Sequence, residues 1–217
     1  MLIIALYWFL QISLSRGPQE KVTSSDSSSS HFMGQNPPNK LAVYYQNTRS
    51  LDNKISLLRS NIHQLHKVPD ILLFTETWLL VAINKAIPAT ENDGPEDLEL
   101  LIVKFELEEG KYILLVIYIP PSNYSRRHLY SKLAQTVDHL ANRYRQHEFI
   151  IAGDFNLPYI RWTYNPLTVH ENEASLDHRV CANLLQQIAG RVNLEQYCKE
   201  ILGKGYSLEL LFAHQNS

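Results

Sequence analysis

Residues 148–158 read EFIIAGDFNLP, and this stretch decides the fold. Its first half, Glu148–Ala152, is a short apolar run of the kind that predicts a buried strand. The chain then becomes abruptly polar at Asp154 and Asn156, directly after the conformationally free residue Gly153. Open α/β sheets bind ligands where strands give way to loops, so this junction is a candidate site. An Asx-rich turn is the alternative explanation.

Strand and helix patterns alternate on either side of this stretch. Apolar, β-favouring runs predict further strands at 41–46, 71–75, 98–107, 112–118 and 207–213. Amphipathic spacing predicts helices at 50–65, 125–144 and 175–189. A tight turn at Glu108–Lys111 is expected to join two of the strands into a hairpin. Strands mixed with single helices predict an α/β fold in layers around a mixed sheet.

The composition is that of an ordinary soluble protein. The 217 residues are 45% hydrophobic and 19% charged, with a net charge of −2. These values exclude a polybasic nucleic-acid tail, an acidic disordered chaperone and a collagen-like chain, but they permit a basic groove on one face. The two cysteines, Cys181 and Cys198, are too few for a disulfide framework or a four-thiolate zinc site. Reduced thiols in an intracellular protein are expected.

The first forty residues differ from the rest of the chain. Residues 1–16 are apolar and uncharged until Arg16, but shorter than the ~20 residues that a membrane-spanning helix needs. They resemble the core of a signal peptide, and unrelated upstream sequence in a gene model is the alternative. Residues 17–40, rich in Ser, Pro and Asn, are predicted to be a disordered linker. The globular domain is then expected at 41–217.

Four predicted strands end in a polar residue that can bind a metal, position a phosphate or move a proton. These residues are Asn47, Glu76, Tyr118 and Asp154. Each also has a structural explanation. An Asn can cap a turn, a Glu can mark an exposed strand end, and a Tyr can pack with its hydroxyl at the surface.

Taken together, the order and spacing of these motifs resemble the endonuclease/exonuclease/phosphatase superfamily. The motifs are NTRS at 47–50, TETW at 75–78, YIPP at 118–121 and GDFNLP at 153–158 with Trp162 after it. The last of them resembles, more narrowly, the apurinic-type endonuclease domain of non-LTR retrotransposon polyproteins. The resemblance implies a layered α/β sandwich of two mixed β-sheets flanked by helices, running from residue 41 onward.

The resemblance also implies a Mg²⁺-dependent phosphodiesterase, with Mn²⁺ as a possible substitute. Glu76 would be the main metal ligand, with Asn47 beside it, and hard dications prefer such oxygen donors. Tyr118 would donate a hydrogen bond to the scissile phosphate. Asp154 would activate the attacking water, and Asn156 would orient the phosphate or the aspartate.

DNA is the partner that the resemblance implies. Arg49, Arg126 and Arg127 are candidates for contacts with backbone phosphates, and solvated surface charge is their alternative explanation. No stable protein partner is implied, and a membrane is implied only if the apolar N-terminus is a genuine signal. An endonuclease would act in the nucleus, whereas a genuine signal would direct the chain to secretion or to a membrane.

The sequence departs from the family pattern at two places. The strand position that carries Asp in the family reads Leu208-Glu209-Leu210, and no Ser-Asp-His motif follows it up to Ser217. The segment 80–85 follows the Glu76 loop almost directly, and there is no glycine between Gly34 and Gly94 for a hairpin turn. These features predict an internal deletion and an incomplete sheet.

Three functions therefore stay open, and the enzymatic status with them. The first is a Mg²⁺-dependent DNA endonuclease of retrotransposon origin. The second is a catalytically dead or unstable remnant with at most weak binding of DNA or phosphate. The third is a hydrolase of small phosphoesters from the same superfamily, against which the LPYIRW extension at 157–162 argues.

Overall fold

The computed structural model describes residues 8–11, 42–47, 60, 69–75, 80–108, 110–121, 126–158, 160–162, 169–171, 174–196 and 209–214. The predicted linker at 17–40 lies outside these residues. So does the predicted helix at 50–65, apart from Ser60, which is helical.

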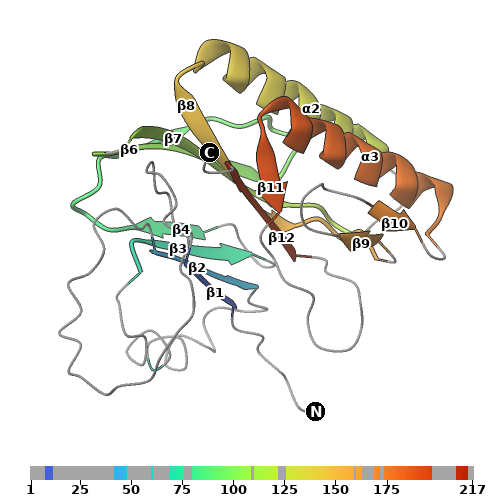
Figure 1. The fold of residues 1–217 in the computed structure, drawn as a ribbon, viewed down its shortest axis with the longest axis horizontal. Helices are drawn as coiled ribbons and strands as arrows, with labels where there is room; N and C mark the ends of the chain where they lie inside the picture. The colour runs from blue at the N-terminus through green and yellow to red at the C-terminus, as the bar shows by residue number, and fades with distance from the viewer. Residues whose placement is uncertain are drawn as a thin grey trace, which may run out of the picture.

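A six-stranded mixed sheet forms the centre of the molecule (Figure 1). Its strand order is β11-β12-β8-β7-β6-β5, and only the β7–β8 pair is parallel. The strands are β5 (Ala89–Asn92), β6 (Leu100–Leu107), β7 (Gly110–Tyr118), β8 (His147–Asp154), β11 (Leu194–Gln196) and β12 (Glu209–His214). The predicted hairpin is present, since β6 and β7 pair antiparallel up to Leu107 and Gly110, although Gly110 and Lys111 of the predicted turn belong to β7.

A four-stranded sheet packs against one face of the six-stranded sheet. Its order is β1-β2-β3-β4, with β2 and β3 parallel and the outer strands antiparallel. Its strands are β1 (Trp8–Gln11), β2 (Ala42–Asn47), β3 (Ile71–Thr75) and β4 (Leu80–Ile83). Ile71 and Leu73 alternate along β3 and are fully buried against Leu114 and Val116 of β7, as the period of two in a strand requires. A separate two-stranded sheet pairs β9 (Ile160–Trp162) with β10 (Val169–Glu171).

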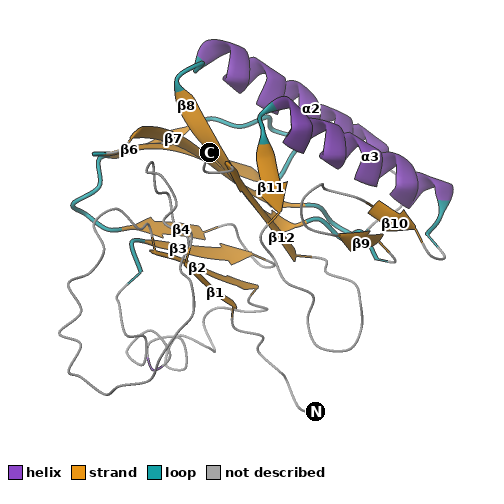
Figure 2. Ribbon diagram, in the orientation of Figure 1, coloured by secondary structure: helices purple, strands orange, loops and turns teal. Residues whose placement is uncertain are grey.

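Two helices, α2 (Arg126–Arg143) and α3 (Leu176–Arg191), cover the other face of the six-stranded sheet (Figure 2). The predicted apolar stripe of α2 is buried, and it consists of Leu129, Leu133, Val137 and Leu140. Ser175 caps α3 by accepting a hydrogen bond from the backbone N–H of His178. In the described part of the chain, no helix combines the length and the apolar character that crossing a membrane requires.

The predicted α/β fold, a layered sandwich of two mixed sheets with helices, is confirmed. The predicted strands and the helices predicted at 125–144 and 175–189 are present, with ends that differ by a few residues, and β3 has the predicted bounds. The helix predicted at 50–65 stays a prediction. The short strands β5, β9, β10 and β11 were not predicted, since three or four residues carry too little periodicity to be recognised.

Two segments that the sequence analysis treated as anomalies contribute strands. Trp8–Gln11, within the signal-like N-terminal segment, pairs antiparallel with β2 and forms one edge of the smaller sheet. Leu80–Ile83, which follows the position of the predicted deletion, pairs antiparallel with β3. The connecting residues 76–79 lie outside the described part of the chain, so the predicted deletion stays a prediction.

Gly153 is required where β8 runs into its loop. Its φ of 156° is rare for L-residues, and a Cβ built there would overlap the carbonyl oxygen of Ile117 on β7. Gly153→Ala is therefore expected to lower the free energy of unfolding by at least about 3 kcal/mol, measured by urea denaturation. Gly190→Ala is the matched control, since nothing lies within 4 Å of its Cβ position, and stability should stay equal or rise slightly. Equal losses in both variants would contradict the close approach at Gly153.

Three histidines make the stability depend on pH. Burial lowers the pKa of His147, His178 and His214 below the usual value of about 6.5. Their contribution to stability is therefore complete above about pH 6.5 and is lost as the pH falls from there through the lowered pKa values. The free energy of unfolding should fall between about pH 7.5 and about pH 5.5. His147→Gln should reduce this dependence, and a free energy of unfolding that does not change with pH would contradict the prediction.

Candidate active site

Three predicted site residues lie on one row across the six-stranded sheet. Tyr118, the last residue of β7, pairs in register with Asp154, the last residue of β8. Asp154 pairs in turn with Glu209, the first residue of β12. Residues directly opposite in neighbouring strands lie on the same face of a sheet, so the row groups these positions at one edge. Asp154 itself is only 2% exposed.

The turn after β8 holds the Asp154 carboxylate in place. The backbone N–H of Asn156 donates to Oδ1 of Asp154 at 3.0 Å, and Asn156 has the left-handed backbone conformation, with φ of 45°. The alternative explanation from the sequence, an Asx turn, is thus present, and it orients the carboxylate rather than excluding a role for it.

The loop after β7 is bound to the same turn. The backbone N–H of Ile119 donates to the carbonyl of Asp154 at 2.8 Å. In return, the side-chain Nδ2 of Asn156 donates to the carbonyl of Ile119 at 2.7 Å. Two strand ends that are far apart in the chain are therefore joined by hydrogen bonds beside Asp154.

Arg126, predicted to contact phosphate, has a different environment. It is 3% exposed, and its guanidinium donates to the carbonyls of Asn156 at 3.0 Å and Pro121 at 2.9 Å. A buried guanidinium bonded to two loop carbonyls does not fit a contact with a DNA backbone, which requires exposure. The sequence did not reveal the burial of Arg126, because an arginine in the first turn of an amphipathic helix is usually solvated.

Tyr130 is a residue beside the site that the sequence analysis missed. It is fully buried, and its hydroxyl donates to the carbonyl of Phe155 at 2.5 Å. Burial raises the pKa of Tyr130 well above its usual range, so the hydroxyl stays protonated and able to donate. The only signal in the sequence is its spacing of four residues from Arg126, which places both on one side of α2.

The remaining predicted residues lie in different places. Asn47 ends β2 and pairs in register with the buried Thr75, the residue before Glu76. The side chain of Asn47, and Glu76 and Arg49 altogether, lie outside the described residues. Arg127 is half-exposed and forms an ion pair with Asp177, which links α2 to α3.

The predicted metal site is only partly covered by the structure. Among the described side chains, no group of three His, Cys, Asp or Glu could hold a metal ion. The donors that are described near the row, the carboxylate of Asp154 and the amide of Asn156, are of the oxygen type that Mg²⁺ prefers. Glu76 and Asn47 stay predictions as metal ligands, and Glu209 stays the position where the sequence departs from the family pattern.

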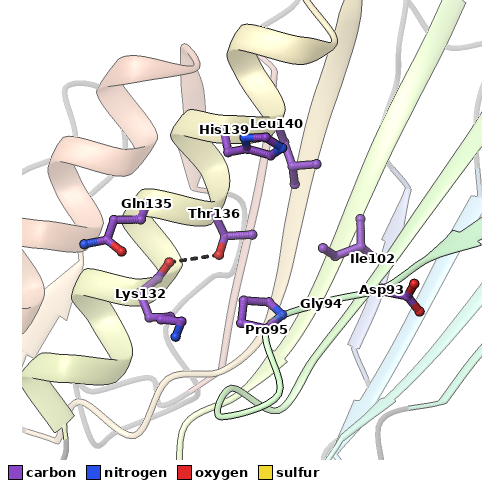
Figure 3. Close-up of a pocket in the computed structure, with 9 residues that line it drawn as sticks. All are labelled: Asp93, Gly94, Pro95, Ile102, Lys132, Gln135, Thr136, His139 and Leu140. Carbon is purple, nitrogen blue, oxygen red and sulfur yellow. Dashed lines mark hydrogen bonds between the residues drawn. The ribbon is translucent and has the colours of Figure 1, made fainter.

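A cavity of about 330 Å³ lies apart from this row, between α2 and the loop before β6 (Figure 3). Asp93, Pro95 and Ile102 line one side, and polar residues of α2 line the other. The ammonium of Lys132 on this side is bonded to Asp97 at 2.8 Å, and Lys132 and His128 lower the Asp97 pKa to about 2. No predicted site residue lines this cavity.

The known proteins to which this chain is similar share little sequence identity with it. No protein-family model matches this sequence, and no curated protein matches it. A solved endonuclease domain of TRAS1, a telomere-specific non-LTR retrotransposon, is 11% identical with a TM-score of 0.49, covering 80% of this chain and 85% of that one. A humanized D. rerio TDP2 is 12% identical with a TM-score of 0.49, at 80% and 82% coverage.

The catalytic domain of human Nocturnin is a third similar structure. It is 13% identical, with a TM-score of 0.46, and the match covers 76% of this chain and 75% of that one. The TRAS1 domain belongs to the class of protein that the sequence motifs resemble. Similarity at this level assigns no activity, so the activity of this chain has to be inferred from its own residues.

Asn156 contributes to stability in two separable ways. Asn156→Ala should lower the free energy of unfolding by about 2 kcal/mol, because the Ile119 carbonyl loses its donor and alanine adopts positive φ less readily than asparagine. Asn156→Gly should lose only about half as much, since glycine adopts this φ without strain. Asn193 is exposed and has a φ of 50°, so the same substitutions at Asn193 measure the effect of the backbone conformation alone. Equal values for Asn156→Gly and Asn156→Ala in urea denaturation would contradict the strain.

Proposed function

We propose that this chain is a Mg²⁺-dependent phosphodiesterase that nicks DNA, of retrotransposon origin. The single observation that supports it best is the row Tyr118–Asp154–Glu209 across the ends of β7, β8 and β12. This row combines a phenol with acidic residues at the edge of the sheet where the strands give way to loops, the place at which open α/β sheets bind ligands.

In this proposal Asp154 takes the proton of the attacking water. A general base must lie within hydrogen-bond reach of its proton and keep a fixed orientation. The bond from the Asn156 N–H to Oδ1 fixes the orientation of the Asp154 carboxylate. Tyr118, next to Asp154 in register, would donate a hydrogen bond from its hydroxyl to a phosphoryl oxygen and keep its proton.

Glu76 and Asn47 are the residues that would hold Mg²⁺ in this proposal. Asn47 ends β2 directly beside Thr75, so the backbone register brings the Asn47 position next to the start of the Glu76 loop. The bound ion would neutralise the negative charge that develops on the phosphoryl oxygens. The side chains described near the row of strand-end residues, the carboxylate of Asp154 and the amide of Asn156, carry oxygen atoms of the kind that Mg²⁺ prefers as ligands.

A nicking assay tests the proposed function. Supercoiled plasmid is incubated with the full chain and Mg²⁺, and the open-circular product is quantified. Asp154→Asn, which preserves the shape of the buried side chain, should lower the nicking rate by at least about 100-fold. Asp138→Asn is the control, because Asp138 pairs with Arg191 on the helices and should keep the wild-type rate.

The outcomes separate the three candidate functions. Nicking that EDTA abolishes and Asp154→Asn removes supports the endonuclease. Hydrolysis of a small phosphodiester without nicking would replace DNA with a small substrate. No hydrolysis of either kind by a chain with a sharp, cooperative melt would overturn the enzymatic proposal and favour the inactive remnant.

A further inference from the structure

The first turns of α2 lie beneath the two loops that carry the proposed catalytic residues. Arg126 and Tyr130 are four residues apart and therefore project from the same side of the helix. Both are buried, at 3% and 0% exposure. Neither contacts solvent enough to act as a surface charge or a surface hydroxyl.

Their hydrogen bonds all end on carbonyl groups of these loops. Tyr130 donates to Phe155, and Arg126 donates to Asn156 in the same loop. The second arm of the Arg126 guanidinium donates to Pro121 in the loop after β7. One helix therefore supplies donors to three loop carbonyls and joins the loop after β7 to the loop after β8.

Asn156 is held from several directions at once. Helix α2 binds its carbonyl, its side chain donates to the Ile119 carbonyl, and its own N–H holds Oδ1 of Asp154. A displacement of the Asn156 backbone would therefore move the Asp154 carboxylate. Misplacing a reactive group by about 1 Å can cost on the order of 100-fold in rate.

The geometry of the guanidinium explains why this position holds arginine. Its planar fork presents N–H groups in fixed directions, whereas a lysine ammonium is a compact point charge on a flexible stem. The two bonded groups, Nη1 and Nη2, reach carbonyls on different loops at 3.0 and 2.9 Å. A single ammonium has no comparable span.

We propose that Arg126 and Tyr130 are positioning residues, which hold Asp154 and Asn156 in the geometry that hydrolysis requires. This inference rests on the proposed function, and it assigns to Arg126 a role in the loops instead of a contact with phosphate. Neither residue touches the substrate.

Steady-state kinetics of nicking provide the first test. Tyr130→Phe removes one hydroxyl, Arg126→Met removes the donors while filling the space, and Arg126→Lys keeps the charge without the fork. Each variant should lower kcat about 10- to 100-fold and leave KM for DNA within about 3-fold. Arg143→Met, at the last residue of α2, and Tyr144→Phe, directly after it, are the matched controls and should keep wild-type kcat.

Amide hydrogen exchange provides a second readout that needs no activity. In the three variants the Asn156 amide should exchange at least about 10-fold faster, because its bond to Asp154 is weakened. The Ile151 amide, within β8, should keep its wild-type rate. A uniform loss of protection in β8 would show a general loss of stability, which would overturn the positioning role.

The two readouts distinguish failure of the inference from failure of the proposed function. An inactive wild-type chain overturns the function, while the exchange rate of the Asn156 amide still decides whether the loops depend on α2. Unchanged exchange in Arg126→Met with a raised KM would restore the phosphate contact and overturn the inference. Faster exchange at Asn156 with unchanged kcat would overturn it as well.

Discussion

The parallel pairing of β7 with β8 is the constraint on which the rest of the structure depends. Parallel neighbours end at the same edge of a sheet, so Tyr118 and Asp154 are brought together although 36 positions separate them in the chain. Parallel pairing also requires a crossover, and α2 supplies it. The same pairing fixes the close approach that only glycine permits at Gly153, opposite Ile117.

The crossover helix α2 also supplies hydrogen-bond donors to the carbonyls of the loops. Loops that leave a buried sheet carry backbone carbonyls that need donors, and secondary structure does not provide them. Here the donors are side chains, namely Arg126 and Tyr130 from α2 and Asn156 from the turn. The polar network around Asp154 therefore satisfies the backbone and orients a carboxylate at the same time.

Much of the fold could be predicted from local patterns, and most of what was missed depends on tertiary contacts. A continuous apolar run located β3, and the three- and four-residue spacing of apolar residues located the stripe of α2. The edge strand β5 is short, and Ala89 to Glu91 are exposed, so no apolar alternation marks it. The N-terminal strand β1 resembled a signal core, since an apolar segment alone does not reveal its partner.

The row of strand-end residues follows from positions that the sequence singled out, whereas the side chains that hold the loops beside it could not be predicted. Polar residues at strand ends are visible in the sequence, and the register then aligned Tyr118, Asp154 and Glu209. The burial of Arg126 was not visible, because a charged residue at a helix start is solvated in most proteins. Its hydrogen bonds depend on the position of two loops that only the folded sheet brings together.

The charges near the site bear on the choice between DNA and a small phosphoester. Affinity for a DNA backbone comes from cations that can neutralise phosphates. Of the cations described at the start of α2, Arg126 is buried, and Arg127 and Lys132 are paired with Asp177 and Asp97. A DNA contact through these residues would have to break ion pairs that are partly exposed, and such pairs are weak. Binding of DNA at the start of α2 would therefore require these ion pairs to open. The neutral product of this pairing leaves the substrate to be decided by hydrolysis itself, since a small phosphoester needs fewer cations than a DNA backbone.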